Sequence, residues 1–411
     1  MSQVAVVGAG IVGVSIAFEL QRNGFQVVLI DRDRPGMGAS YGNMASVAVT
    51  EFLPSSRPSV WSKMPFWLID PNGPVSFRAG YMPKLMPWLA RFIMAGLPSR
   101  VRQIEAAGAV LCKRVHGDLL ALLKSVGLMD VLSREGCLSL YANDAEFDAD
   151  RDHIDVLERY GLAHEVLDCE AARDLEPALS PAFSKVVLFP ENLSIRDPFE
   201  LVTALCERFE AAGGRVLRGE VVDFTRTSAD WTIQFSDGRA ISTAQFVISA
   251  GAYSGRLSAK LGEPIPLETE RGYHTQLSTP GVELRHSLIW PARAFMVTPT
   301  AGGLRIGGTV EMAGLDAAPN FRRAKVLVRH AEDALPGLQT DQATEWMGHR
   351  PALPDTLPII GSSEKNPGVF YATGHGHLGL TYAATTARLI ADLVCGRVPP
   401  IDMAPYRVNR F

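Results

Sequence analysis

The sequence has few cysteines, and none of them is clustered. They are scattered and odd in number: Cys112, Cys137, Cys169, Cys206 and Cys395. The chain has no CxxC pair and no Cys/His cluster, so the sequence predicts neither a zinc site nor a disulfide framework. We therefore expect no bound metal and a reducing compartment.

Long apolar runs and an excess of charge are also missing. No run reaches the roughly 18 residues of a membrane-spanning helix, and we see no secretory signal at the start of the chain. The net charge of −4 gives no electrostatic reason to bind nucleic acid. At 411 residues and 47% hydrophobic content, the chain has the composition of a cytoplasmic globular protein with two or three domains, or two interleaved ones.

The elements that open the chain follow a nucleotide-binding order. Val4–Val7 is a short β-branched run, typical of a buried parallel strand. Ile11–Arg22 predicts a helix that Asn23-Gly24 closes, and Val27–Ile30 predicts a second strand. This is the order of a βαβ unit.

Three glycines in G-x-G-x-x-G spacing lie where the first strand meets the helix. Gly8 permits a tight turn, Gly10 lets the backbone approach a pyrophosphate, and Gly13 lets the helix pack against the strand. The N–H groups and positive dipole end of the helix suit phosphates. Asp31 follows the second strand, where it can accept hydrogen bonds from both ribose hydroxyls. The full pattern predicts a dinucleotide site, and the alternative is a glycine-rich turn in another α/β fold.

Two later segments are also typical of a dinucleotide-binding sheet. Gly214–Ala250 predicts several strands around an Asp237-Gly238 turn and ends in ISAGAYS, a small-residue turn. Gly368–Leu393 predicts a strand, a turn rich in Gly and His, and a long helix. Long insertions separate these fragments, as a large extended cofactor requires, whereas an NAD domain usually runs continuously. We therefore expect FAD.

Five longer motifs are spread over the chain. They are GAGIVG at the start, GASYGNMAS at Gly38–Ser46, ERGYHTQL at Glu270–Leu277, WMGHRPALPDTLPIIG at Trp346–Gly361 and ATGHGHLGLT at Ala372–Thr381. On these motifs the chain resembles the D-amino-acid oxidase (DAO) family of FAD-dependent oxidoreductases, most closely its bacterial D-amino-acid dehydrogenase branch. The resemblance covers nearly the full length. It implies an α/β fold: a Rossmann-like, glutathione-reductase-type FAD-binding domain interleaved with a substrate domain built on an antiparallel β-sheet with helices.

The same resemblance suggests how the chain is divided. We expect an FAD-binding domain of residues 1–50, 146–255 and 346–411, and a substrate-binding domain of residues 51–145 and 256–345. The later insertion alternates apolar and polar residues, as an antiparallel sheet does. The earlier one is apolar at Trp61, Phe66–Leu68 and Tyr81–Arg100, with Arg and Lys nearby. Two interpretations of it stay open: helices packed on the sheet, or contact with a membrane or quinone pool, as in members of the branch.

The resemblance also assigns cofactor contacts. Ser40, Gly42 and Asn43 match a small polar segment that lies beside the flavin and its phosphates in relatives, although such a cluster is also typical of a surface loop. Gly374–Gly379 precedes a helix whose N–H groups would face the flavin pyrimidine edge, and Val222 matches the position whose backbone reads the adenine. The residues expected at the cofactor are Gly8, Gly10, Ile11, Val12, Gly13, Asp31, Arg32, Ser40, Gly42, Asn43, Met44, Val222, Ala250, Gly251, Gly374, His375, Gly376, His377, Leu378, Gly379, Leu380 and Thr381.

One arginine is the strongest candidate for substrate binding. Arg350 in Gly348–Pro351, GHRP, matches the G-x-R-P arginine that holds the substrate carboxylate in the family. A guanidinium suits this role because its planar fork binds a carboxylate in a bidentate way and keeps its charge. The alternative is an arginine in a structural ion pair.

Five further residues are expected near the reaction or the flavin. Tyr273 resembles a tyrosine of the dehydrogenase branch and is followed by His274; strand neighbours point in opposite directions, so one of the two can face the pocket but not both. Trp290 falls where relatives carry an aromatic lid. A core position is an equal alternative for these three residues. We expect His375 near the flavin and His377 at its edge, with no metal bound by the pair.

The expected reaction is oxidative deamination, as in amino-acid catabolism. The resemblance implies oxidation of a D-amino acid by hydride transfer to flavin N5, giving an imine that hydrolyses to a 2-oxo acid and ammonia, with electrons passed to a quinone or other carrier. No cysteine lies near Arg350, where sarcosine-oxidase relatives attach their flavin, so the FAD should be non-covalent. Alternatives are an oxygen-using oxidase of glycine, sarcosine or a cyclic imino acid such as D-proline, or the flavin subunit of a larger dehydrogenase complex. The chain could be a homo- or hetero-oligomer.

Overall fold

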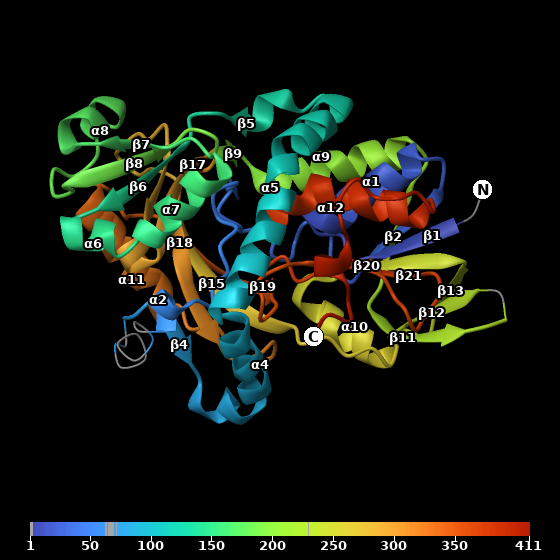
Figure 1. Cartoon of the computed structure of the whole chain (residues 1–411). Helices are drawn as coiled ribbons and strands as arrows, with labels where there is room; N and C mark the ends of the chain where they lie inside the picture. The colour runs from blue at the N-terminus through green and yellow to red at the C-terminus, as the bar shows by residue number, and fades with distance from the viewer. Residues whose placement is uncertain (1–2, 62–63, 65–69, 71, 229) are drawn as a thin grey trace.

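A computed structural model describes residues 3–61, 64, 70, 72–228 and 230–411 (Figure 1). The predicted apolar stretch Phe66–Leu68 lies outside the described residues. Figure 1 shows helices α1, α9 and α12 at one end of the molecule, α6, α7 and α8 at the other, and the long helix α5 running between them.

One sheet, which we call the parallel sheet, joins segments that are far apart in the sequence. Its strand order is β10 (Arg215–Arg218), β2 (Gln26–Asp31), β1 (Gln3–Val7), β14 (Gln245–Ile248), β21 (Val369–Thr373) and β20 (Ile359–Ser362). Its described pairings are parallel except that of β20 with β21. The predicted α/β architecture is therefore confirmed, although β1 and β2 are slightly longer than predicted and β14 ends before Ala250.

The strands of the parallel sheet are apolar because both of their faces are covered. Val4 and Val6 point into a core shared with the helices, whereas Ala5 and Val7 belong to a second core. The helices are α1 (Ile11–Arg22), α9 (Pro198–Ala211) and α12 (Gly379–Val394), and the second core lies against a small sheet of β11 (Val221–Arg226), β12 (Trp231–Phe235) and β13 (Ala240–Thr243). Burial on both faces explains why the first strand lacks the alternation of a surface strand.

A larger sheet, which we call the mixed sheet, forms the second half of the molecule. Its order is β19 (Ala343–Ala352), β15 (Glu268–Leu277), β18 (Gly303–Met312), β17 (Phe295–Thr300), β16 (Ser287–Trp290), β6 (Cys137–Tyr141), β8 (Lys185–Phe189) and β7 (Glu165–Leu167), and β4 (Val75–Phe77) pairs with β18. Most neighbouring strands are antiparallel; β16 with β6 and β18 with β4 are parallel. Strands β7 and β8 come from the expected FAD segment 146–255, and the expected boundary at 346 falls inside β19. The sheet thus uses more of the chain than the expected substrate segments.

The remaining elements connect and cover the two sheets. They are a small sheet of β3 (Ser46–Val47), β9 (Leu193–Ile195) and β5 (Leu132–Ser133), and helices α2 (Pro58–Trp61), α4 (Met82–Ala95), α5 (Pro98–Val126), α6 (Asp144–Asp148), α7 (Arg151–Tyr160), α8 (Cys169–Leu175), α10 (Ser254–Lys260) and α11 (Arg322–Ala334). In the described part of the chain, each helix is too short or too polar to cross a bilayer.

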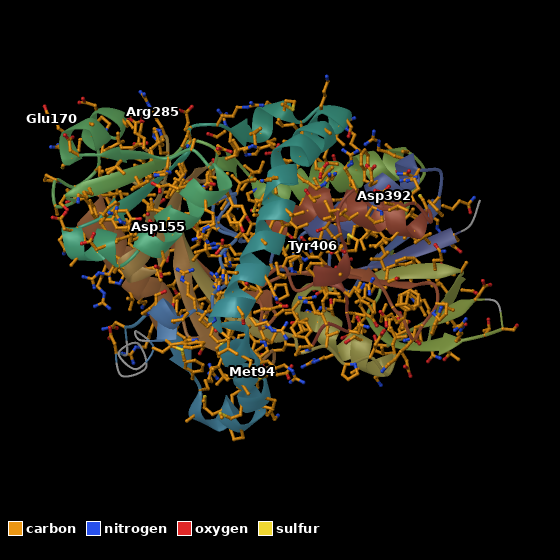
Figure 2. The ribbon with its side chains drawn as sticks, viewed as in Figure 1. Met94, Asp155, Glu170, Arg285, Asp392 and Tyr406 are labelled. Carbon is orange, nitrogen blue, oxygen red and sulfur yellow. The ribbon has the colours of Figure 1, made fainter. Side chains whose placement is uncertain are left out.

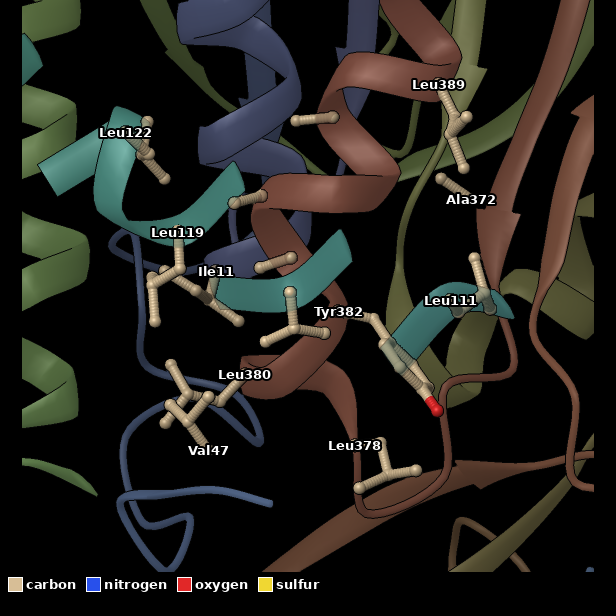
Figure 3. Close-up of a cluster of buried hydrophobic side chains, with 14 of the residues drawn as sticks. Ile11, Val47, Leu111, Leu119, Leu122, Ala372, Leu378, Leu380, Tyr382 and Leu389 are labelled. Atoms are coloured by element: carbon tan, nitrogen blue, oxygen red, sulfur yellow. The ribbon is translucent and has the colours of Figure 1, made fainter. Parts of the chain in front are cut away.

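The main hydrophobic core lies beneath the first turns of α1 and α12. Leu119 of α5 packs near Ile11 at the start of α1, and Leu380 at the start of α12 lies beside Val47 (Figure 3). Tyr382 is buried in the same cluster. Because these side chains are close-packed, the two helix N-termini are held at fixed positions.

Candidate active site

A cavity of about 880 Å³ is lined by residues of both sheets. The predicted site residues that line it are Gly8, Gly10, Ile11, Val12, Asp31, Arg32, Ser40, Gly42, Asn43, Met44, Ala250, Gly251, Tyr273, His274, Arg350, His375, Gly376, His377, Leu378, Gly379 and Leu380. Five others are absent from the described lining: Gly13, Val222, Trp290, Gly374 and Thr381. The structure therefore brings most of the predicted residues together.

The glycines of the turn after β1 have two different roles. Two of them are required by the backbone packing, and one leaves space at the cavity. Gly8 has φ +108°, and a Cβ there would collide with the carbonyl of Ser249. A Cβ on Gly13 would collide with the carbonyl of Gly8. By contrast, the nearest atom to a Cβ on Gly10 is Ser40 Oγ, at 3.2 Å. Gly10 thus keeps the backbone open toward the cavity, as a pyrophosphate requires.

Asp31 stands at the end of β2 with both of its carboxylate oxygens fixed. Oδ2 accepts a hydrogen bond from the Ala9 N–H at 2.6 Å, and Oδ1 accepts one from the Asp33 N–H at 2.9 Å. Burial raises the pKa of Asp31, and these two N–H groups oppose the shift. The remaining lone pairs of a carboxylate can accept ribose hydroxyls. Next to it, the Arg32 guanidinium lies 3.8 Å from the ring centroid of Tyr253.

Val222, the expected adenine contact, is not among the described residues that line the cavity, whereas its neighbour Val221 is. Val221, with Gly219 and Glu220, lines the cavity, whereas Val222 does not and is 38% exposed. The β11–β12 pairing has an irregularity between Val221 and Asp223. Such a bulge changes which residue faces a given side, and nothing in the sequence pattern announced it.

The Gly/Ser/Asn segment predicted at the flavin is attached to the first helix and to the mixed sheet. Ser40 Oγ accepts a hydrogen bond from the Ile11 N–H at 2.9 Å, at the start of α1. Asn43 Nδ2 donates to the Ser40 carbonyl at 3.0 Å, and Arg305 Nη1 donates to the Asn43 carbonyl at 2.6 Å. A Cβ on Gly42 would collide with the indole of Trp346. The segment is therefore a packed part of the cavity wall.

Another wall of the cavity is one face of the paired strands β15 and β19. The register places Glu270 opposite Arg350, Gly272 opposite Gly348 and His274 opposite Trp346. The rings of His274 and Trp346 are stacked with centroids 5.1 Å apart. His274 Nδ1–H donates to the Gly42 carbonyl at 2.8 Å, and burial lowers the pKa of His274 to about 4. This ring is neutral near pH 7 and connects the mixed sheet to the cofactor segment.

Arg350 extends across β15 to reach β18. Its guanidinium lies over Gly272, where any Cβ would collide with it. Nη1 donates to the Thr309 carbonyl at 2.8 Å and Nη2 to the Gly308 carbonyl at 3.4 Å. Thr309 has φ 55°, and Arg323 Nε donates to its hydroxyl at 2.8 Å. A guanidinium has five N–H donors, so Arg350 keeps donors that can bind a ligand in the cavity.

Tyr273 and His274 direct their polar atoms to opposite sides of β15, as expected of strand neighbours. Although Tyr273 contributes to the lining, its hydroxyl donates to Glu311 Oε2 at 2.5 Å and accepts from the Asn320 N–H at 2.8 Å. The tyrosine hydroxyl is therefore engaged in a buried network, and the imidazole of His274 is the side chain directed to the cofactor segment.

Trp290 does not form the expected lid. Its Nε1–H donates to Glu146 Oε2 at 2.9 Å, and its ring packs against Phe183, with centroids 4.8 Å apart. It belongs to the core under the mixed sheet. The loose match to an aromatic position in relatives was misleading because the face of β16 could not be known from the sequence.

The two histidines of GHGH differ. His375 is buried, its Nε2 forms a hydrogen bond with Thr386 Oγ1 at 3.0 Å, and burial lowers its pKa to about 3. His377 is accessible from the cavity, and burial lowers its pKa while Glu51 opposes the shift. His375 is thus a neutral structural group beside the cavity, and His377 lies at its edge.

Sequence reasoning did not single out several lining residues. Glu270 and Trp346 lay inside motifs that were recognised, but no pattern indicated that they face the same side as Arg350. Trp88 and Phe92 of α4 form an apolar wall, and their helical spacing was equally typical of ordinary core packing. Long-range register would have been needed to find them.

The fold and the site together define an FAD-dependent oxidoreductase. The chain belongs to the family "DAO: FAD dependent oxidoreductase", whose match covers residues 3–393. It is 36% identical to a protein of Bradyrhizobium diazoefficiens named D-amino-acid oxidase, over 99% of this chain and 98% of that one. It is 30% identical to a D-amino acid dehydrogenase of Dechloromonas aromatica, over 97% and 98% of the two chains.

Solved structures show the same fold at lower identity. Glycine oxidase from Geobacillus kaustophilus superposes with a TM-score of 0.79 at 21% identity, covering 100% of both chains. Iminodiacetate oxidase from Chelativorans sp. BNC1 gives 0.74 at 21% identity, covering 98% of each chain. At these identities the likeness concerns the fold alone.

Proposed function

We propose that this protein oxidises D-amino acids to imines, which hydrolyse to 2-oxo acids and ammonia. The observation that carries the proposal is Arg350, a guanidinium in the cavity with N–H groups left for a carboxylate. The chemistry that bound FAD would supply is that of a hydride acceptor for the substrate α-carbon. The names of the relatives, D-amino-acid oxidase and D-amino acid dehydrogenase, support this substrate class.

The residues of the cofactor side fit FAD without a covalent bond. Gly10 gives the pyrophosphate close backbone approach, Asp31 accepts the ribose, and the N-termini of α1 and α12 offer N–H groups. In the described part of the chain no cysteine lines the cavity. Acid precipitation should release all of the FAD into the supernatant. Flavin that stays with the chain would contradict non-covalent binding.

The chain's own residues mainly orient the substrate. Arg350 fixes the carboxylate, and the apolar wall of Trp88, Leu89 and Phe92 receives the side chain and excludes water. His274 holds the cofactor segment to strand β15 through the Gly42 carbonyl. Such positioning is a large part of what a hydride transfer needs from a protein.

Anaerobic bleaching of the flavin tests the proposal. The holoenzyme is mixed without oxygen with D- and L-amino acids, D-proline and glycine, and the flavin absorbance is followed. We expect D-amino acids with apolar side chains to bleach it. Bleaching by none of these compounds, or by L-amino acids alone, would contradict the proposed function.

The electron acceptor separates this proposal from a second one. We propose a quinone or other carrier; the relative named an oxidase supports an oxygen-using enzyme instead. That alternative extends to glycine, sarcosine or cyclic imino acids. Hydrogen peroxide formed in stoichiometric amount with product would identify the oxidase. Stable co-purifying chains and no turnover with artificial acceptors would indicate a flavin subunit of a larger complex.

Helix α4 is the surface that we propose for membrane contact at the cytoplasmic face. Met86, Ile93 and Met94 are exposed, at 54%, 49% and 55%, and Met94 is labelled in Figure 2. Exposed Lys84 and Arg91 lie on the same helix, and basic residues beside an apolar face favour anionic lipid. The protein should sediment with vesicles that contain anionic lipid, and the double change Ile93→Ser and Met94→Ser should reduce this. No sedimentation of the unchanged protein would contradict the contact.

A further inference from the structure

A carboxylate without an assigned role lies beside Arg350. Glu270 is directly opposite Arg350 in the β15–β19 register, and both residues line the cavity. Burial raises the pKa of Glu270, and the charge of Arg350 opposes this. In the part of the chain that the structure describes, no hydrogen bond or ion pair holds the Glu270 carboxylate. A polar group kept in such a place without a partner is costly, which suggests that it serves a ligand.

The neighbouring carboxylates are already engaged. Glu268, two positions earlier on the same face of β15, accepts hydrogen bonds from the Tyr81 hydroxyl at 2.8 Å and the Thr269 N–H at 2.7 Å. Glu51, which also lines the cavity, has its Oε1 3.9 Å from His153 Nε2. Of these three carboxylates, Glu270 is the one for which the described residues provide neither a hydrogen bond nor an ion pair, whereas Glu51 has a long ion pair and Glu268 has two hydrogen bonds.

Arg350 does not satisfy Glu270 either. Its guanidinium extends over Gly272 and donates to the carbonyls of Gly308 and Thr309. The two charges thus face the cavity side by side and do not form a closed ion pair. On the other side of β15, Glu270 is opposite Met312, which packs with Trp88.

We infer that Glu270 binds the ammonium group of the substrate while Arg350 binds its carboxylate. This inference rests on the proposed function and adds the group that recognises the amine. Side chains directly opposite each other have Cβ atoms about 4.5–5.5 Å apart, a spacing that suits two charges on one α-carbon. The surroundings of the pair at Met312 and Trp88 are apolar, so they suit an uncharged substrate side chain and disfavour a cationic one.

Glu270 and Arg350 together therefore select substrates that carry both an ammonium group and a carboxylate. A 2-hydroxy acid, in which a neutral hydroxyl replaces the ammonium, would leave the Glu270 charge without a counter-ion and would place its own carboxylate near a second one. Like charges at this distance repel. The site should consequently prefer amino acids over the matching hydroxy acids, although both offer Arg350 the same carboxylate.

Two variants and one analogue test this inference. Holoenzymes of the unchanged protein, Glu270→Gln and the control Glu268→Gln are compared. The measurements are kcat/KM for D-phenylalanine and the Kd of D-phenyllactate, read from the absorbance of the bound flavin. We expect Glu270→Gln to lower kcat/KM by roughly tenfold to several hundredfold and to leave phenyllactate binding unchanged or tighter. Glu268→Gln should change both by less than about threefold, as expected for a residue outside the cavity.

Three results would overturn the inference. Glu270→Gln could behave like Glu268→Gln. It could weaken D-phenylalanine and D-phenyllactate equally, in which case Glu270 only positions Arg350. It could also lower kcat/KM for D-lysine and D-arginine alone, in which case Glu270 binds the substrate side chain.

A measurement on the unchanged holoenzyme tests the inference if Glu270→Gln loses its flavin. In the unchanged holoenzyme, half-saturation of anaerobic flavin reduction by D-phenylalanine should occur well below the Kd of D-phenyllactate. Equal values for the two compounds would contradict recognition of the ammonium group by Glu270. If the unchanged holoenzyme is reduced by no amino acid at all, the proposed function itself fails, and this result is distinct from the others.

Discussion

The cofactor side and the substrate side of the cavity are built from different parts of the chain. On the cofactor side, the site consists mainly of backbone groups and glycines of one short segment after β1, together with Asp31 at the end of the next strand, β2. On the substrate side, side chains of β15 and β19 meet only because the two strands pair. One side is specified by local sequence, and the other by the register of a sheet.

Glycine serves both sides but for different reasons. Gly10 leaves space for a ligand, whereas Gly272 leaves space for the guanidinium of Arg350. A substitution of Gly10 should therefore affect cofactor binding, and a substitution of Gly272 should affect substrate binding. This difference can be tested, and the variants below either separate the two sides or show that they are coupled.

The largest effect is expected on the substrate side, at Arg350. Arg350→Ala removes a charge-assisted contact from a partly dry pocket, so kcat/KM should fall by about 3–5 kcal/mol in transition-state stabilisation, a hundredfold to several-thousandfold. Arg350→Lys should recover part of this because it keeps the charge and loses the fork. The flavin content should stay full. Near-normal kcat/KM in Arg350→Ala would show that the arginine is structural.

The stability of the folded protein should depend on pH through His153, which contacts the Thr50–Glu51 segment beside the cavity. Its Nε2 forms a hydrogen bond with the Thr50 carbonyl at 3.0 Å, and its Nδ1 lies 3.5 Å from Asp150 Oδ2. Burial alone would lower the pKa of His153, but Glu51 and Asp150 outweigh burial and raise it to about 9. Because the folded state holds the proton more tightly, the stabilisation is complete below about pH 6.5 and is lost as the pH rises through about 9.

The shift corresponds to at most about 3 kcal/mol. The midpoint temperature of thermal unfolding of the unchanged protein should decrease as the pH is raised from 6.5 to 9.5. His153→Gln should remove most of this dependence on pH. His164→Gln serves as the control, since His164 Nε2 lies 3.8 Å from Glu158 near the surface. An identical dependence on pH in His153→Gln would show that the protonation of this histidine does not stabilise the fold.

A pair of glycine substitutions compares the two sides directly. In Gly272→Ala the new methyl group would displace Arg350, so we expect a KM increase of about tenfold to a hundredfold with full flavin content. In Gly10→Ala the nearest atom, Ser40 Oγ, is 3.2 Å away. That variant should fold and lose flavin, because its backbone can no longer approach the pyrophosphate. Loss of flavin in Gly272→Ala would mean that the sides are coupled.

The same division explains what the sequence could predict. The helix at Ile11–Arg22 and the roles of Gly8 and Gly13 follow from local spacing, and the structure has that helix with the same bounds. The face of Trp290 and the contribution of Glu270 depend on which strands pair, and no local pattern contains that information. Fixed spacing within a short segment is readable from one sequence, whereas register between distant strands is not.

A smaller effect is expected from Asp31 on the cofactor side. Asp31→Ala removes an acceptor for the ribose and for the Ala9 N–H, and a hydrogen bond to a charged group contributes about 1.5–3 kcal/mol. FAD should therefore dissociate more readily, by roughly tenfold or more in Kd, while the protein stays folded. The control Asp33→Ala should retain flavin. Full flavin in purified Asp31→Ala would contradict the role.

The smallest functional effect is expected at Trp290, for which the sequence left a lid position and a core position open, and which the structure has in a core. Trp290→Phe removes the hydrogen bond to Glu146 and part of the ring volume. This should lower the free energy of unfolding by about 1–3 kcal/mol. The ring is outside the described cavity lining, so KM and kcat should stay within about twofold at temperatures where the variant is folded. A selective rise in KM with unchanged stability would restore Trp290 to the site and would show that the substrate side extends beyond the β15–β19 face.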